Sequence, residues 1–440
     1  MAKLKRNVGL FGAASVGIAN IIGAGIFVVS GVAAGLAGPS VVLSFLIAGF
    51  IALMTALSSA ELASFITETG ASYAFTKRAF GRVLSFFVGW FKYFDYVAGA
   101  AAVSVGFAAY FTELFGLSGP LPLILAAMGL PLVFVILNLI GARESAYTTS
   151  VMVLIKVFAL VLLLMFGGFY LVHYFNVAKF TPFFPNGING TMNGTAIIFF
   201  AFLGFNTVAM MSEETKDPER TIPRALLLAF VVTFVLYVSI AFLEIAVLDW
   251  RQLGLSASPL EALALVVYNN RLFVDFIAFS ALIATGSVVL SSIIGEARAS
   301  FAMGRDRLLP QQFDRVSRRF GTPYVSVLVG GLIIVLLAAT FYNNIDAIAS
   351  IVNFGSLFTY LFVHLSVLKL RRSEPETKRL FRVPLYPVVP ILGASSCILL
   401  MYYLSNNAKI ASAVWFGAGL VMFAAMARIG KRGIDTKQRP

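Results

Sequence analysis

The chain alternates between apolar stretches, most of them about as long as a membrane-spanning helix, and short polar connections. A helix of ~20 residues crosses a ~30 Å hydrocarbon core, and lipid offers no partners to backbone groups outside a helix or closed barrel. The pattern therefore predicts an all-α polytopic membrane protein with about twelve transmembrane helices. We expect these spans at approximately residues 10–36, 41–66, 84–115, 121–140, 149–172, 191–212, 222–248, 272–302, 323–341, 346–369, 385–404 and 409–428.

Composition and charge agree with a membrane location. The chain is 59% hydrophobic and 12% charged, whereas charged residues make up roughly a quarter of a soluble domain. The net charge of +13 could suit nucleic acid, but most Lys and Arg lie in the termini and the even-numbered loops. Positive residues mark the cytoplasmic side, so we expect a plasma membrane protein with both termini cytoplasmic and no nucleic acid partner. The opposite loops hold only Lys179, Arg251, Arg271 and Lys409.

The sequence contains little that suggests cofactor or enzyme chemistry. A single cysteine, Cys397, excludes an internal disulfide and a cysteine metal cluster, and His173 and His364 are isolated in sequence. No nucleophile elbow, zinc-binding His-Glu-x-x-His motif or Walker glycine loop occurs. We therefore expect no enzyme activity, no metal and no cofactor. The expected surroundings are the lipid bilayer, and the sequence implies no obligatory protein partner.

Glycines interrupt the first and the sixth predicted spans, at Gly23 and Gly25 and at Gly204. Glycine at mid-span weakens a helix and lets the backbone open. Interruptions at corresponding places in two spans point to the central site of a transporter, although close packing of small residues is an alternative explanation. The two spans are five apart. If the spans form two structural repeats, this odd offset gives the second repeat the inverted orientation in the membrane, as alternating access about a midplane site requires.

Several motifs occur in a fixed order along the chain. They include Ile22-Gly-Ala-Gly-Ile-Phe27 and Gly70-Ala-Ser-Tyr73. The remaining segments are 60–63, 199–206, 213–224 and 302–310. Together these segments resemble the amino acid-polyamine-organocation superfamily. The resemblance implies a leucine-transporter-like 5+5 inverted repeat with broken helices 1 and 6, plus two extra C-terminal helices.

This resemblance divides the chain into five parts. A cytoplasmic N-terminus (1–9) precedes helices 1 to 5 as the first repeat (10–174) and helices 6 to 10 as the second repeat (190–370). A cytoplasmic loop with helices 11 and 12 (371–428) and a cytoplasmic tail (429–440) complete the chain.

The broken helices predict a site for a zwitterion. A half-helix beginning after Gly25 would direct free amides and a positive dipole end at a carboxylate, and a helix ending near Gly204 would direct free carbonyls at an ammonium group. The resemblance implies that the carboxylate of an amino acid meets the amides of Ala24 and Gly25, next to Gly23. Its amino group would meet the carbonyls of Ile21, Phe200 and Leu203, and Phe202 and Phe205 are candidates for the side-chain pocket.

Neither broken segment contains an acidic residue. Burying a second, unpaired substrate cation there would be costly, which favours neutral, small or apolar amino acids. Arginine or lysine could instead be held by a cation–π contact with Phe202 or by Asp95.

Lys156 lies in the otherwise apolar run 151–165. A cation at the centre of a membrane helix costs roughly 2.5–3.5 kcal/mol on insertion scales, so such residues usually face the protein interior and have a function. The resemblance implies that this lysine replaces a sodium ion in a proton-coupled transporter. Its ammonium would donate to the carbonyl of Ala19 and to a hydroxyl of helix 8, Ser287 or its neighbour Thr285. The alternative is that Lys156 snorkels to the interface.

Other ionisable groups in the spans have competing interpretations. A resemblance to the cationic-amino-acid-transporter-like branch of the superfamily implies that Asp95 forms a proton-relay pair with Lys156. The alternative is a local pair with Lys92, three residues before it. We expect structural ion pairs at Glu61, and at Glu296 with Arg298. Glu213 and Glu214 are expected to anchor the inner end of helix 6.

These features together predict a secondary active transporter that imports amino acids by proton symport. An exchanger of amino acids or amines is the main alternative. A channel or a transporter-like sensor is a weaker one, because no selectivity-filter sequence occurs.

Overall fold

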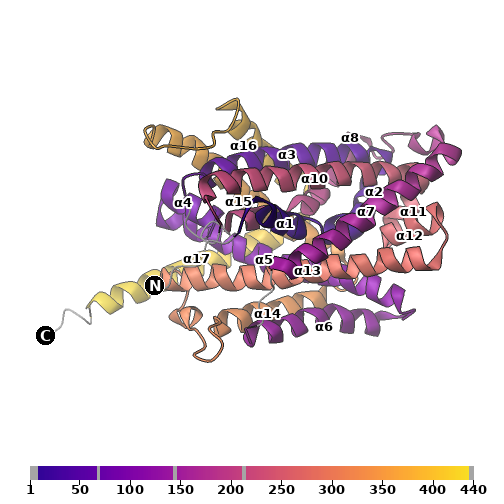
Figure 1. Cartoon of the computed structure of the whole chain (residues 1–440). Coiled ribbons are helices and arrows are strands. Elements are labelled where there is room, and N and C mark those ends of the chain that lie inside the picture. Colours follow the sequence, from indigo (N-terminus) through magenta and orange to yellow (C-terminus); the bar gives the residue numbers. More distant parts are fainter. Residues whose placement is uncertain (1–7, 67–69, 142–145, 211–214, 436–440) are drawn as a thin grey trace.

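The computed structural model describes residues 8–66, 70–141, 146–210 and 215–435. Figure 1 shows long helices lying alongside one another in a bundle, with α4 near one end and α11 and α12 near the other. The end that carries α4 also carries the loop that follows α15, and we call it the basic end because it holds Lys77, Arg78, Arg371 and Arg379.

The first half of the chain contains the elements up to α7. They are α1 (Leu10–Ile21), the π-helix η1 (Gly25–Val29), α2 (Ser30–Ala37), the 3-10 helix η2 (Gly38–Ser40), α3 (Val41–Ala63), α4 (Ser72–Phe80), α5 (Arg82–Leu114), α6 (Pro120–Leu139) and α7 (Ala146–Tyr174).

The second half begins with a short 3-10 helix. Its elements are η3 (Val177–Phe180), α8 (Gly187–Ile198), the 3-10 helix η4 (Phe199–Phe202), α9 (Asn206–Met210), α10 (Pro218–Val247), α11 (Trp250–Leu255), α12 (Pro259–Val267), α13 (Arg271–Arg305), the 3-10 helix η5 (Gln311–Asp314), α14 (Tyr324–Thr340), α15 (Ile345–Ser373), α16 (Val388–Tyr403) and α17 (Asn406–Asp435).

Helices of membrane-spanning length confirm the predicted all-α, multi-pass class. Among the described residues, 9 helical runs are long and apolar enough to cross a membrane, and the first of them, Leu10–Ala63, covers both the first and the second predicted span. Two shorter apolar helices, α14 and α16, coincide with the ninth and eleventh predicted spans. The count of about twelve spans and the inverted repeat remain predictions.

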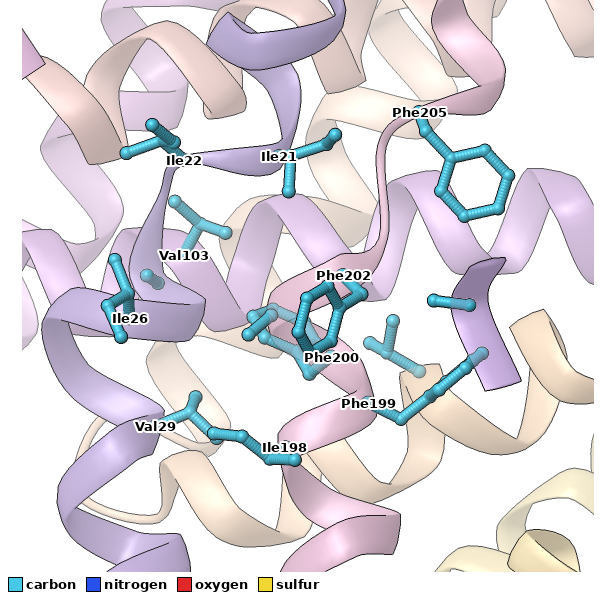
Figure 2. Packing of buried hydrophobic residues seen from close by; sticks show 14 of the residues in the cluster. Ile21, Ile22, Ile26, Val29, Val103, Ile198, Phe199, Phe200, Phe202 and Phe205 are labelled. Carbon is cyan, nitrogen blue, oxygen red and sulfur yellow. The ribbon is translucent and has the colours of Figure 1, made fainter. Parts of the chain in front are cut away.

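The first and sixth spans are interrupted where the glycines occur. The first breaks between α1 and η1 at Ile22 and Gly23, and the sixth breaks between η4 and α9 at Leu203 to Phe205. Figure 2 shows Ile21 and Ile22 at the first break and, close to them, Phe200 and Phe202 beside the second; the Ile22 side chain points away from the two phenylalanines. The two interruptions therefore lie together in the middle of the bundle.

Two glycines are required for this close approach. A Cβ atom on Gly25 would lie 2.2 Å from the Cα of Ala201, so any side chain there would push the two broken spans apart. Gly204 has a φ of 105° and its added Cβ would lie 2.5 Å from the carbonyl oxygen of Asn20. Such a positive φ is strained for residues with a side chain.

Two motifs that are far apart in sequence meet at the basic end. The Tyr73 hydroxyl of α4 donates to Asp306 Oδ2 at 2.6 Å, and the Lys77 ammonium donates to the same oxygen at 2.7 Å. Burial would raise the pKa of Asp306, but these two hydrogen bonds and the positive charges of Lys77 and Arg305 together outweigh burial and hold the pKa below its ordinary value. The contact ties α4 to the end of α13.

The expected ion pair at Glu61 is present. The Glu61 carboxylate of α3 accepts hydrogen bonds from Arg371 Nε at 2.8 Å and from Arg371 Nη2 at 2.6 Å. It also accepts a hydrogen bond from the Val383 amide at 2.7 Å. Arg379 Nε lies 3.5 Å from it. This buried carboxylate therefore joins α3, the end of α15 and the loop that follows α15.

The expected pair between Glu296 and Arg298 is wrong. Glu296 is fully buried and neither of its carboxyl oxygens has a hydrogen-bond partner among the residues that the structure describes, whereas Arg298 is exposed. Residues two apart in a helix do not share a face, so this spacing cannot form an ion pair within α13. Glu213 and Glu214 lie outside the described residues.

We expect Glu61→Gln to destabilise the protein by roughly 3–5 kcal/mol, because it leaves a largely buried arginine without its counter-charge. Thermal unfolding in detergent measures the change. The matched control is Glu374→Gln, which removes an exposed pair with Arg78 and should cost no more than about 1 kcal/mol. Equal Tm values for the two variants would contradict the structural role of Glu61.

Candidate functional site

A cavity lies between the two broken spans and is closed by side chains of α5, α13 and α15. It is mostly apolar, with a polar wall on α5 and α13. The lining residues from the broken spans are Asn20, Ile21, Gly23, Ala24, Gly25, Phe200, Leu203, Gly204 and Thr207, and those from the surrounding helices are Lys92, Asp95, Tyr96, Gly99, Val103, Val288, Ser291, Ser292 and Val352.

Most of the residues that sequence reasoning assigns to substrate binding line this cavity. They are Ile21, Gly23, Ala24, Gly25, Phe200 and Leu203. Phe202 and Phe205 do not. The ring of Phe202 packs against Tyr237, with centroids 5.4 Å apart, and the ring of Phe205 stacks on Tyr360, also at 5.4 Å. Figure 2 shows Phe205 beyond the break, away from Val103.

Backbone polar groups of both breaks belong to residues that line the cavity. The first-turn amides of a helix have no partner within that helix, and here that first turn begins at Ala24 and Gly25 in the cavity wall. The carbonyl of Ile21 accepts a hydrogen bond from the Tyr237 hydroxyl at 2.8 Å, and that of Phe200 accepts from the Leu203 amide at 3.2 Å. Each carbonyl oxygen keeps a second lone pair for a substrate ammonium.

Lys156 reaches from α7 into the interior of the bundle. Its ammonium donates to the carbonyl of Ala19 at 2.7 Å, to that of Ile22 at 3.0 Å and to the Ser287 hydroxyl at 2.6 Å. The side chain is 0% exposed, so it does not snorkel to the interface. The lysine therefore links the last turn of α1, directly before the break, to α13.

The contacts to Ala19 and Ser287 are those that the sequence analysis expects, while their role in proton coupling stays a prediction. Thr285 is oriented differently. Its hydroxyl donates to the carbonyls of Ala281 and Leu282 in its own helix, at 2.7 and 3.2 Å.

Asp95 is engaged by neighbours in the cavity wall. Lys92 forms a hydrogen-bonded ion pair with Asp95 Oδ2, and the Ser356 hydroxyl of α15 donates to Asp95 Oδ1 at 2.6 Å. The Lys92 ammonium also lies 4.6 Å from the centre of the Tyr96 ring. This geometry favours the local pair with Lys92 over a direct relay with Lys156.

Several lining residues escaped sequence reasoning. Asn20 accepts a hydrogen bond from the Ser291 hydroxyl, which gives α1 a second link to α13. Ser291 lies four residues after Ser287, so the helical spacing places both on one face, and Asn20 lies in the last turn of α1 before the break. Ser291 and Asn20 could therefore have been identified from the sequence as candidate site residues. The contact of Tyr237 with Ile21 has no local signal in the sequence.

The model of a family described as amino acid permease matches residues 8–426 of this chain. The chain belongs to this family. The permease is 31% identical to the branched-chain amino acid permease BcaP of Bacillus subtilis and 32% identical to the methylthioribose transporter of the same organism, each over 97% of this chain and 94% of the relative. It is 30% identical to the vacuolar cationic amino acid transporter 2 of Arabidopsis thaliana over 83% of this chain and 60% of the relative.

Family membership makes this permease a membrane transporter of the amino acid-polyamine-organocation superfamily rather than an enzyme. The match extends across both broken spans and all cavity-lining residues. The cavity between the breaks is therefore the candidate transport site.

We expect Gly25→Ala to reduce the initial rate of substrate uptake by about tenfold or more, because an added methyl at this contact overpacks the site by roughly 1–3 kcal/mol. Uptake into proteoliposomes measures it, with the amount of reconstituted protein determined in parallel.

The matched control for this substitution is Gly99→Ala. Gly99 also lines the cavity, but a Cβ there would meet nothing closer than Val352 Cγ1 at 3.9 Å. Similar uptake by the two variants would show that the close contact of Gly25 with Ala201 is dispensable.

Proposed function

We propose that this permease imports amino acids by proton symport, with Lys156 in the place of a coupling sodium ion. The observation that carries the proposal is the buried ammonium bonded to both α1, directly before its break, and α13. In the charged state it clamps α1 against the rest of the bundle. Loss of the proton weakens the clamp and frees α1 to move.

The energies involved are sufficient for such a switch. A hydrogen bond to a charged group contributes about 1.5–3 kcal/mol, and about 5.5 kcal/mol moves a two-state equilibrium from 1:99 to 99:1. Losing two or three of the bonds made by Lys156 is therefore enough to change which conformation dominates.

Neutral amino acids fit the electrostatics of the cavity. The acidic residue in its described lining is Asp95, which is already paired with Lys92. A substrate with a cationic side chain would have to displace this lysine or remain without a partner, and leaving a buried charge unpaired is costly. The apolar lining by Val103, Val288 and Val352 agrees with a small or apolar side chain.

The same proposal includes the orientation in the membrane and the repeat. We propose that the basic end faces the cytoplasm of a plasma membrane protein, since positive residues stay on that side. Residues 10–174 and 190–370 would then form the two inverted repeats around the site.

We expect Lys156→Ala to abolish uptake driven by an imposed pH gradient while preserving substrate binding, because the backbone groups of the site remain. The measurements are uptake of labelled alanine into proteoliposomes with an acidic exterior, and binding of alanine to the purified protein. Thr285→Ala is the control, because this hydroxyl bonds within its own helix. Unchanged proton dependence in Lys156→Ala would refute the proposed coupling.

Counterflow separates symport from exchange in the same vesicles. A symporter accumulates alanine from the pH gradient alone, whereas an exchanger needs substrate inside the vesicle. Accumulation only after preloading would replace symport by exchange.

We expect unlabelled neutral amino acids to inhibit alanine uptake at least about tenfold more strongly than arginine does, since one uncompensated interaction of about 1.4 kcal/mol already produces that ratio. Lys92→Gln should increase the inhibition by arginine, because Asp95 loses its counter-ion. Equal inhibition by arginine and neutral amino acids in the wild type would contradict the proposed preference.

A further inference from the structure

A groove lies at the basic end between α4, α15 and α16, and it shares no lining residue with the candidate transport cavity. Its walls are apolar, formed by Phe80, Leu365, Leu368, Pro387 and Ile391, and its rim carries Lys369, Arg372 and Ser373. Ile391 is 48% exposed in the bundle, so the groove opens towards the surroundings of the helices rather than into the protein interior.

One stripe of α15 changes from apolar to cationic as it passes this groove. Leu365, Leu368, Lys369 and Arg372 are spaced at i, i+3, i+4 and i+7, so they lie on the same face of the helix. The helix ends directly afterwards, at Ser373. The change from leucine to basic residues at a helix end is the pattern expected where hydrocarbon gives way to lipid headgroups.

Among the described residues, the two cations at the rim differ from their neighbours in having no carboxylate within ion-pair distance. Arg371 and Arg379 are held by Glu61, and Arg78 is held by Glu374. Within the described part of the chain, neither Lys369 nor Arg372 has a carboxylate within ion-pair distance.

Lys369 is instead positioned by an aromatic ring. Its ammonium lies 4.7 Å from the centre of the Phe80 ring, which keeps the charge at the groove. Two cations without counter-ions at the edge of one apolar groove are complementary to a molecule that joins an anion to an apolar chain.

We propose that this groove binds an anionic phospholipid. Its phosphate lies between Lys369 and Arg372, and an acyl chain follows Leu365, Leu368 and Ile391. The apolar walls favour a lipid over a soluble phosphate, because only the lipid buries hydrocarbon there. The two positive charges favour an anionic headgroup over a zwitterionic one, as in other basic pockets between helices at a membrane surface.

Binding at this position stabilises the end of α15. This end also carries Arg371, which bonds Glu61 of α3. A lipid that neutralises Lys369 and Arg372 removes the repulsion among the cations at this helix end. Anionic lipid should therefore raise the thermal stability of the permease more than zwitterionic lipid does.

The test compares phosphatidylglycerol with phosphatidylcholine on the purified full chain in detergent, with native mass spectrometry for bound lipid and thermal unfolding for stability. Two cations at the surface are expected to give a preference for phosphatidylglycerol on the order of tenfold or more. Lys369→Gln combined with Arg372→Gln should abolish most of this preference, and Lys369→Arg with Arg372→Lys should retain it.

The matched control is Arg315→Gln combined with Arg318→Gln. These arginines are also exposed, lie between α13 and α14, and have no ion pair in the described chain. They lie outside the groove lining, so the control should keep the lipid preference. Tm without added lipid verifies that each variant is folded.

Three results would overturn the proposal. The first is equal binding of the two lipids by the wild type, and the second is an equal loss of preference in the groove variant and the control. The third is full stabilisation by glycerol phosphate alone, which would identify a site for a small anion without an acyl chain.

Discussion

An interrupted helix inside a membrane leaves carbonyl groups that lipid cannot satisfy, and the surrounding structure depends on meeting that need. Here the donors are side chains from the helices around the two breaks. Lys156 of α7 donates to Ala19 and Ile22, Tyr237 of α10 to Ile21, Tyr110 of α5 to Phe27, and Asn353 of α15 to Ala196 and Ile197. The central site persists because its neighbours replace the hydrogen bonds that the broken helices lose.

This set of donors also separates binding from switching. Tyrosine hydroxyls and asparagine amides donate without a change of charge near neutral pH, so the contacts of Tyr237, Tyr110 and Asn353 are constant. Lys156 is the one donor of this set that can lose a charge, and it contacts α1 on the side of the break away from η1. Under the proposed coupling, a change in its protonation would act on α1, and the amides at Ala24 and Gly25 in the cavity wall are not among its hydrogen-bond partners.

The sequence predicted the parts of this arrangement that carry an evident energetic cost. A lysine in an apolar run and glycines at mid-span lower the stability of a membrane helix unless they have a structural or functional role. Lys156, Gly25 and Gly204 could therefore be identified as functional candidates. Tyr237 and Asn353 could not, because their partners lie more than a hundred residues away and a polar residue in a span fits many roles. The packing of Phe202 against Tyr237 of α10 could not be predicted either, because no local signal in the sequence marks that contact. Glu296 was paired with Arg298 without regard to helical spacing.

The helix α15 connects the features that otherwise seem independent. Asn353 holds the carbonyls that precede η4, and Ser356, three residues later on the same face, bonds Asp95 in the cavity wall. At its other end the same helix carries Arg371, which bonds Glu61, and the basic rim of the apolar groove between α4, α15 and α16. Contacts of this one helix therefore join the sixth-span break, the Lys92–Asp95 pair and the basic end.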